Sequence, residues 1–163
     1  MRMGNLSYVM FILGIGLLFL ISGCIGQPSK APPSPAGVSP TVDPVMGQID
    51  ASLEKGPVFI EFGAPWCSWC EKQKPILNNL TNEYPGVYFY SVNTDENQEL
   101  PDAFYVNGIP QMNMIAKKNA DGTYLYIDPY GKPTADRRKS AIIGYTPIDQ
   151  LRPVFDAAWE ARR

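Results

Sequence analysis

The chain has 163 residues, which is enough for one ordinary domain with appended segments. Its 14 Lys and Arg side chains against 16 Asp and Glu side chains give a formal net charge of -2, which provides no basic surface for nucleic acid. The chain has no histidine, and this excludes Ser-His and Cys-His nucleophile pairs and removes the commonest metal ligand.

Residues 1–25 are typical of a targeting segment. Arg2 supplies a weak positive start, an unbroken run of apolar residues and glycine covers residues 8–21, and two small residues precede Cys24. The run is short for a membrane span, which needs about 20 residues. The segment resembles a lipoprotein signal, in which cleavage leaves Cys24 at the new N-terminus for lipidation, and an uncleaved helical anchor is the alternative. Both predict a domain tethered at the extracytoplasmic face of the membrane.

Residues 26–44 are predicted to be a linker. Six prolines lie there among small and polar residues, and such a segment cannot bury enough surface to fold. We expect an extended spacer that rises about 3.1 Å per residue. The globular domain is then expected over residues 45–163.

Helix and strand patterns fill this domain. Helices are expected at residues 44–56, 67–84, 97–106 and from residue 147 on, and strands at residues 58–62, 87–92, 111–116, 123–127 and 140–145. Strands connected through helices, followed by a hairpin and a last helix, predict an α/β domain whose mixed sheet lies between helices.

Some details of these elements are also predicted. Asp43 and Thr146 are expected to cap the first and the last helix. The strand at residues 87–92 is apolar enough to be buried on both faces. Residues 128–139 contain a second turn signal where one hairpin suffices, so they form either a long loop or an additional edge element.

Two cysteines follow the strand at residues 58–62 after a Gly63-Ala64-Pro65 turn, at a spacing that one turn of helix can hold. Cys67 would lie in the first turn, where unpaired N–H groups and the helix dipole stabilise a thiolate and lower its pKa below about 8.5. Cys70 would be shielded on the same side, placed to attack Cys67 and resolve a mixed disulfide. We interpret the pair as a redox-active dithiol.

A structural disulfide and a metal site are the alternatives for this pair. A bridge across two residues closes almost no loop and therefore stabilises the fold little. The chain has three cysteines and no histidine, so it cannot assemble a zinc site once Cys24 is used elsewhere. We expect no metal and no cofactor, because the dithiol is itself the redox group.

Residues 58–75 resemble the active-site segment of the thioredoxin superfamily, with Trp66–Cys70 (WCSWC) in the WCxxC position and Pro75 as the helix proline. The resemblance continues at Gly108-Ile109-Pro110, which matches the cis-proline loop of the family, and at Gly144. It covers about residues 45–161 and implies a thioredoxin fold and thiol-disulfide exchange with protein partners.

The resemblance also implies roles for residues around the thiols. Glu61 matches a buried acid thought to exchange a proton with Cys70, unless its side chain reaches the sheet edge and solvent. Pro110 would follow a cis bond beside the dithiol, where neighbouring backbone pairs with an extended substrate. Trp66 and Ile109 would bind substrate in an apolar collar around the sulfur, with ordinary packing under the loop as the alternative.

The sequence departs from the family pattern at several positions. Ser68 and Trp69 stand between the cysteines, where thioredoxins have Gly-Pro and oxidising periplasmic enzymes have Pro-His, and both would tune the redox potential. The absence of histidine removes one source of thiolate stabilisation, which favours a reducing or isomerase-like couple. Ser91 aligns with the lysine that often accompanies the buried acid, so Glu61 lacks that partner.

These observations predict a membrane-tethered, exported thiol-disulfide oxidoreductase. It would act as a monomer on disulfides of exported proteins and exchange electrons with a dithiol donor or acceptor. The sequence leaves the direction of electron flow open. The alternative function is a protein-binding module of thioredoxin fold whose disulfide stays oxidised.

Overall fold

The computed structural model describes residues 43–163. The predicted targeting segment at residues 1–25, its lipidation site Cys24 and the linker up to residue 42 lie outside the described residues. Within residues 43–163, no helix combines the length and the apolar character that a membrane crossing requires.

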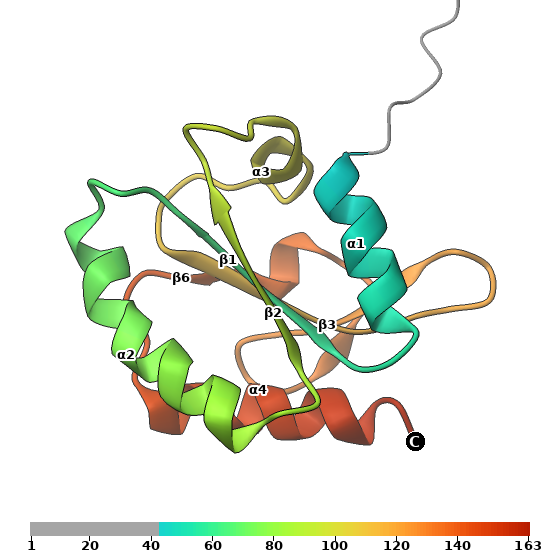
Figure 1. Cartoon of the computed structure of the whole chain (residues 1–163). Helices are drawn as coiled ribbons and strands as arrows, with labels where there is room; N and C mark the ends of the chain where they lie inside the picture. Colours follow the sequence, from blue (N-terminus) through green and yellow to red (C-terminus); the bar gives the residue numbers. More distant parts are fainter. Residues whose placement is uncertain (1–42) are drawn as a thin grey trace, which may run out of the picture. The chain divides into compact units, whose positions relative to one another are not determined.

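The helices and strands follow the predicted order, with one added strand (Figure 1). In chain order they are α1 (Pro44–Leu53), β1 (Val58–Gly63), α2 (Ser68–Glu83), β2 (Tyr88–Asn93), α3 (Glu99–Ala103), β3 (Gln111–Lys118), β4 (Tyr124–Ile127), β5 (Pro133–Thr134), the 3-10 helix η1 (Arg138–Ser140), β6 (Ile142–Ile143) and α4 (Ile148–Glu160). Asp43 caps α1 as predicted, because its carboxylate accepts the N–H groups of Val45 at 2.7 Å and Met46 at 3.2 Å.

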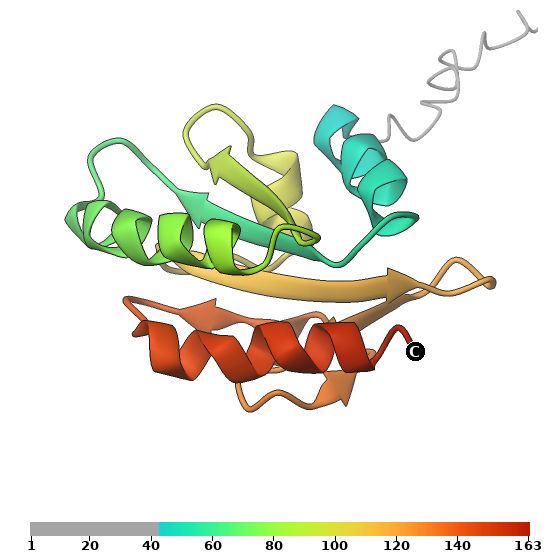
Figure 2. The same ribbon diagram turned by 60° about the horizontal axis from the view of Figure 1, so that its bottom comes forward.

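A mixed sheet forms the middle layer, as predicted. Its strand order is β2-β1-β3-β4-β5, and β6 pairs with the first residues of β3. β1 pairs with β2 in parallel and with β3 in antiparallel orientation. Figure 2 shows α4 running below the sheet, with α1 and α3 on the other side.

Each face of the sheet has its own apolar core. Phe59 of β1 packs on the face covered by α2 and α4, together with Leu80 and Phe155. Ile60 and Phe62 point to the opposite face, which α1 and α3 cover. Because side chains alternate along a strand, Glu61 shares the α2 face with Phe59. The sheet therefore directs this carboxylate toward the helix that carries the cysteines.

The prediction that the second strand is buried on both faces is wrong. β2 lies at the edge of the sheet, and only Val92 of its six residues is buried. The tyrosines of β2 make its sequence look apolar, because a tyrosine combines an apolar ring with a hydroxyl that can stay in solvent or form a hydrogen bond. Tyr90, for example, shares a hydrogen bond with the Ser52 hydroxyl at 2.8 Å.

Residues 128–139 form an additional edge element rather than a plain loop. The chain turns at Gly131, which has a φ of 75°, and β5 then pairs with β4 at the end of the sheet. The η1 turn leads back to a last strand of only two residues, β6, where residues 140–145 were expected.

Thr146 does not cap the last helix, contrary to the prediction. Pro147 occupies the N-cap position and α4 begins at Ile148, so Thr146 lies one residue too early. Its hydroxyl instead donates to the Gly144 carbonyl at 3.2 Å, and its N–H donates to Gln73 Oε1 at 2.8 Å. The Gln73 amide, which also donates to the Thr146 carbonyl at 3.1 Å, thus fastens α2 to the start of α4.

Candidate active site

The two cysteines are joined by a disulfide at the start of α2, with their Cα atoms 5.2 Å apart. Cys67 is the N-cap of α2 and Cys70 lies in the first turn, so the spacing places both sulfurs together as the sequence indicates. The N–H of Cys70 donates to Cys67 Sγ at 3.1 Å. The helix therefore already points a backbone donor at the sulfur that would carry the charge of a thiolate.

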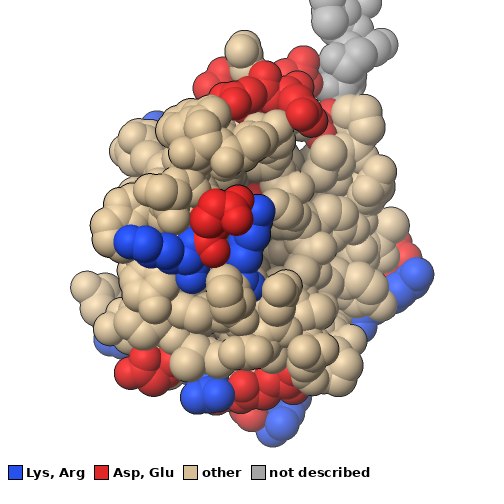
Figure 3. All heavy atoms as spheres, turned by 60° about the vertical axis from the view of Figure 1, so that its left-hand side comes forward, with Lys and Arg blue, Asp and Glu red and all other residues tan. Residues whose placement is uncertain are grey.

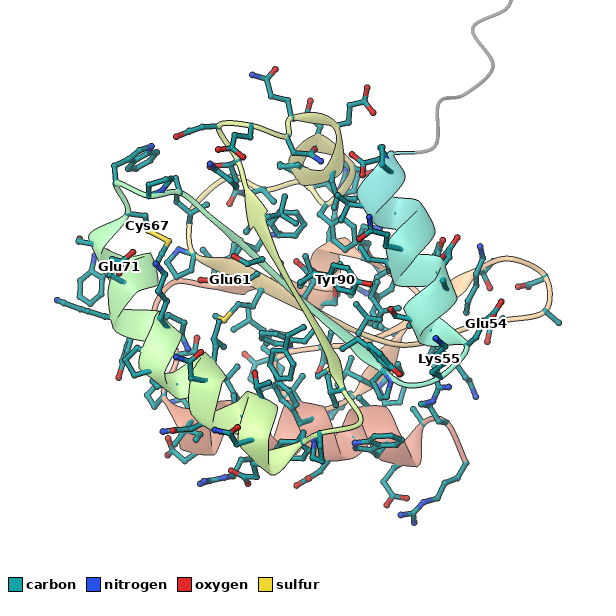
Figure 4. The ribbon with its side chains drawn as sticks, viewed as in Figure 1. Glu54, Lys55, Glu61, Cys67, Glu71 and Tyr90 are labelled. Atoms are coloured by element: carbon teal, nitrogen blue, oxygen red, sulfur yellow. A yellow bond between two sulfur atoms is a disulfide. The ribbon has the colours of Figure 1, made fainter. Side chains whose placement is uncertain are left out.

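Both cysteines are largely covered in this oxidised form. Cys67 is 5% exposed and Cys70 is 3% exposed, and they pack against Ala64 and Ile109. The sequence predicts that Cys67 is more exposed than Cys70, and the difference in their exposed fractions is therefore small in this form. Figure 4 shows the disulfide beside the loop that enters α2, with Glu61 on β1 at its side.

The Ile109–Pro110 peptide bond is cis, as the resemblance implied. Ile109 is half-buried against the cysteine pair, and Pro110 directly precedes β3. The carbonyl of Pro110 accepts the N–H of Gly144 at 2.7 Å, which ties this loop to the residue after β6. The structure thus brings three separate parts of the chain to one end of the sheet, around the disulfide.

Glu61 is buried, with 6% of the residue exposed, so the alternative of a solvated carboxylate at the sheet edge is wrong. Burial raises its pKa above the usual 4.5, while a hydrogen bond from Ser91 and the charge of Lys74 oppose this shift more weakly. Ser91 faces Glu61 across the β1–β2 pairing, with its Oγ 3.4 Å from Glu61 Oε2. Lys74 on α2 therefore supplies part of the positive charge that is missing at position 91.

Trp66 and Trp69 are 70% and 53% exposed, so neither is packed away under the loop. The indole N–H of Trp66 donates to Asp95 Oδ2 at 2.8 Å. The ring of Trp69 lies 4.1 Å from Lys72 Nζ and 6.2 Å from the Tyr145 ring. Ser68, between the cysteines, is exposed at the first position of α2.

Several neighbours of the site were missed by sequence reasoning. Ile143 and Tyr145 expose apolar side chains on either side of Gly144. Asp95 positions the Trp66 ring through the hydrogen bond described above. The only available signal was their position at or just after the end of a strand, because their distance in sequence from Trp66 and Trp69 hides that they lie near them. We call the exposed side chains of Trp66, Trp69, Ile143 and Tyr145, with Ile109, the apolar rim.

A cavity of about 280 Å³ opens on the Cys70 side of the disulfide. It lies between β1, β2 and the first turns of α2 and is lined by residues that include Glu61, Gly63, Cys70, Lys74, Ser91 and Asn93. No group of three or more His, Cys, Asp or Glu side chains in residues 43–163 is arranged to bind a metal ion.

A thioredoxin family model matches residues 46–128, and the match ends where the chain turns toward the additional strand β5. The thioredoxin of Pseudomonas aeruginosa is 31% identical over 86 residues, which are 48% of this chain and 80% of that protein. Chloroplastic thioredoxin M2 of Arabidopsis thaliana is 43% identical over 56 residues, 34% of this chain and 30% of that protein.

Solved thioredoxin structures share the fold. The thioredoxin of Fasciola hepatica is similar with a TM-score of 0.51 and 24% identity, over 69% of this chain and 88% of that one. Chloroplastic thioredoxin z is similar with a TM-score of 0.53 and 19% identity, over 74% of this chain and 92% of that one. The mixed sheet flanked by helices is therefore the thioredoxin fold.

Proposed function

The chain belongs to the thioredoxin family and is a disulfide oxidoreductase with Cys67 and Cys70 as its redox pair, and from this premise we propose that it reduces or isomerises disulfides of exported proteins. The observation that supports this proposal best is the disulfide at the start of α2, where Cys67 Sγ accepts a backbone N–H. That donor favours a thiolate on Cys67 once the bridge is reduced.

The reaction would proceed in two exchanges. The Cys67 thiolate attacks one sulfur of the partner's disulfide, forms a mixed disulfide and releases the other partner sulfur as a thiolate, which takes up a proton. Cys70 then transfers its proton to Glu61 and attacks Cys67, which releases the partner in its dithiol form. The product is the Cys67–Cys70 disulfide, so two electrons pass from the protein to its partner.

Partner binding would use the apolar rim and the loop at Pro110. The exposed rings of Trp66 and Trp69 offer apolar surface beside the disulfide, which is where a partner segment must lie during exchange. The Ile109–Pro110 loop packs on the cysteine pair, and its backbone would bind an extended segment in register with Cys67. Ser68 and Trp69 would tune the potential through their positions in the first turn of α2.

Trapping of a covalent intermediate tests the proposal. A Cys70→Ser variant should accumulate a mixed disulfide between Cys67 and a partner, because the resolving sulfur is missing. The complex is measured on non-reducing gels of membranes and identified after reduction. A Cys67→Ser variant is the matched control and should trap nothing. A bridge that does not equilibrate with glutathione buffer, together with empty trapping lanes, would instead support the binding module.

The pH dependence of resolution tests Glu61. Because burial raises the pKa of Glu61, its carboxylate forms at a higher pH than that of an ordinary glutamate. The rate of mixed-disulfide resolution should therefore rise as pH passes through this raised pKa. Glu61→Gln should slow resolution by about 100-fold and remove the part of the rise that follows the titration of Glu61. Stopped-flow measurement of a model mixed disulfide gives the profile.

Glu54→Gln provides the control for Glu61→Gln, because Glu54 is an exposed glutamate at the end of α1 that neither lines the cavity nor acts on the pKa of Glu61. The pH dependence of the free energy of unfolding gives a second measurement that reports on Glu61. Since the folded state keeps the Glu61 proton to a higher pH than the unfolded chain, the native protein loses stability as pH rises from about 4.5 through the raised pKa. The Gln variant should lack this loss, and an unchanged rate profile would remove Glu61 from the mechanism.

We place the protein at the extracytoplasmic face of the membrane on the basis of the segment at residues 1–25. The apolar run followed by small residues and Cys24 supports a lipid anchor. Full-length Cys24→Ser protein should fail to incorporate labelled fatty acid, whereas the unaltered chain should incorporate it and sediment with membranes. If the variant sediments with membranes unprocessed and the unaltered chain carries no label, the uncleaved anchor is correct.

A further inference from the structure

The cavity beside the disulfide gives access to Cys70 without passing the apolar rim. Its lining includes Cys70 and Pro65, whereas Cys67, Ile109 and the rim tryptophans are absent from the lining found among residues 43–163. A partner protein would approach Cys67 over the rim. The second cysteine therefore has an entrance of its own, on the β2 side of the sheet.

Gly63 creates the inner end of this cavity. A Cβ atom at this position would stand 3.2 Å from Cys70 Sγ and 3.8 Å from Glu61 Oε1. A contact of 3.2 Å with sulfur is tighter than ordinary packing, so any side chain at position 63 would fill the space in front of Cys70. Because glycine leaves that space open, the sulfur and the carboxylate face the same small volume.

The size and charge of the cavity limit what can enter. Its volume of about 280 Å³ is near the lower end of ligand pockets, which start at about 300 Å³, and far above the roughly 30 Å³ share of one water molecule. The charges of Glu71 and Lys74 at its wall compensate each other in an ion pair. Figure 3 draws the side on which α2 lies, and there acidic and basic side chains lie together among uncharged surface, with a separate acidic group at the upper edge. A small uncharged molecule fits these conditions.

We propose that this cavity admits a small, uncharged monothiol to Cys70 Sγ, so that low-molecular-weight thiols can open the Cys67–Cys70 disulfide from its second sulfur. The inference rests on the redox activity proposed above and adds a second class of electron donor. Protein partners would still exchange at Cys67, at the apolar rim. The chain would thus accept electrons from small thiols and deliver them to proteins through different sulfurs.

The chemistry favours this direction of opening. The uncharged monothiol gives its proton to the Glu61 carboxylate as its sulfur bonds to Cys70 Sγ, while the bond between the two cysteine sulfurs breaks and the electron pair leaves on Cys67. Cys67 is the better leaving group, because a donor at the helix start lowers the pKa of its thiol. A second monothiol then attacks the small molecule's own sulfur in the mixed disulfide at Cys70. This forms the small disulfide and leaves the electron pair on Cys70. Glu61 can protonate the Cys70 thiolate, so two monothiols become one disulfide and the protein becomes a dithiol.

Single-cysteine variants of the full-length chain test the proposal, with Cys24→Ser in every arm. Cys67→Ser leaves only Cys70, and its reaction with 2-hydroxyethyl disulfide is followed by acid quench and mass spectrometry over a range of pH. Adding Gly63→Ala should lower the pH-independent rate constant of Cys70 by at least about tenfold, because the new methyl group occupies the path to the sulfur. Gly47→Ala is the matched control, since its Cβ would contact nothing within 4 Å.

The companion variant Cys70→Ser leaves only Cys67, whose rate constant should change less than about twofold on adding Gly63→Ala.

Ser91→Leu, at an exposed position of β2, narrows the cavity from the opposite wall and replaces Gly63→Ala in the test if that variant does not fold. An equal effect of Gly63→Ala on both cysteines, or a Cys70 that does not react even with Gly63 present, would overturn the inference. A Cys67 that also fails to react would instead overturn the proposed function.

Discussion

Replacing Cys67 by serine is expected to abolish the reduction of protein disulfides, with a loss of at least about a thousandfold in the rate with insulin or a disulfide peptide. A serine hydroxyl does not ionise near neutral pH, so the N–H of Cys70, which points at Cys67 Sγ at 3.1 Å, would have no anion to stabilise. Cys70 would keep its thiol, but it lines the cavity on the β2 side, whose lining does not include the rim tryptophans. The rate of insulin reduction with a dithiol donor measures the loss.

Cys24→Ser is the matched control for this variant, because it makes the same atomic change outside the proposed site. It should leave the rate of insulin reduction in solution unchanged. If Cys67→Ser keeps more than about a tenth of the rate, the nucleophile is Cys70 and the assignment of the two sulfurs must be reversed. In that case, protein disulfides as well as small thiols would reach Cys70 through the cavity beside it.

The part of the fold around the dithiol could be predicted because its signals are local. A strand, a Gly-Ala-Pro turn and the start of a helix lie within about fifteen consecutive residues, and the Cys-x-x-C spacing alone places both sulfurs on one helical turn. The capping of α1 by Asp43 is similarly local. The mixed sheet followed from the order of elements, since parallel strands need a crossover helix.

The cap of α4 was misplaced locally by one residue, but the larger errors concern long-range information. The sequence of β2 does not say that the strand lies at the edge, because its tyrosines suit a half-exposed as well as a buried position. The additional strand β5 depends on an edge of β4 that becomes available only when the sheet has formed. The cavity was missed for the same reason: the importance of Gly63 depends on Cys70 of α2 and Ser91 of β2 closing around it.

Phe155→Ala is expected to lower the free energy of unfolding by about 3 to 5 kcal/mol. Phe155 on α4 is fully buried, and its ring centroid lies 4.9 Å from that of Phe59 and 4.9 Å from that of Tyr84. Truncation to alanine would leave a void where α4 meets both β1 and the end of α2. Urea unfolding, with an unchanged slope and a lower midpoint, measures the effect.

Phe89→Ala is the matched control, because Phe89 belongs to the same aromatic cluster, 5.6 Å from Phe155, but lies half-buried on the edge strand β2. Its loss should be clearly smaller, since part of its ring already contacts water and the site can relax outward. Equal losses for the two variants would mean that the aromatic contacts, rather than burial under α4, set the stability of this core.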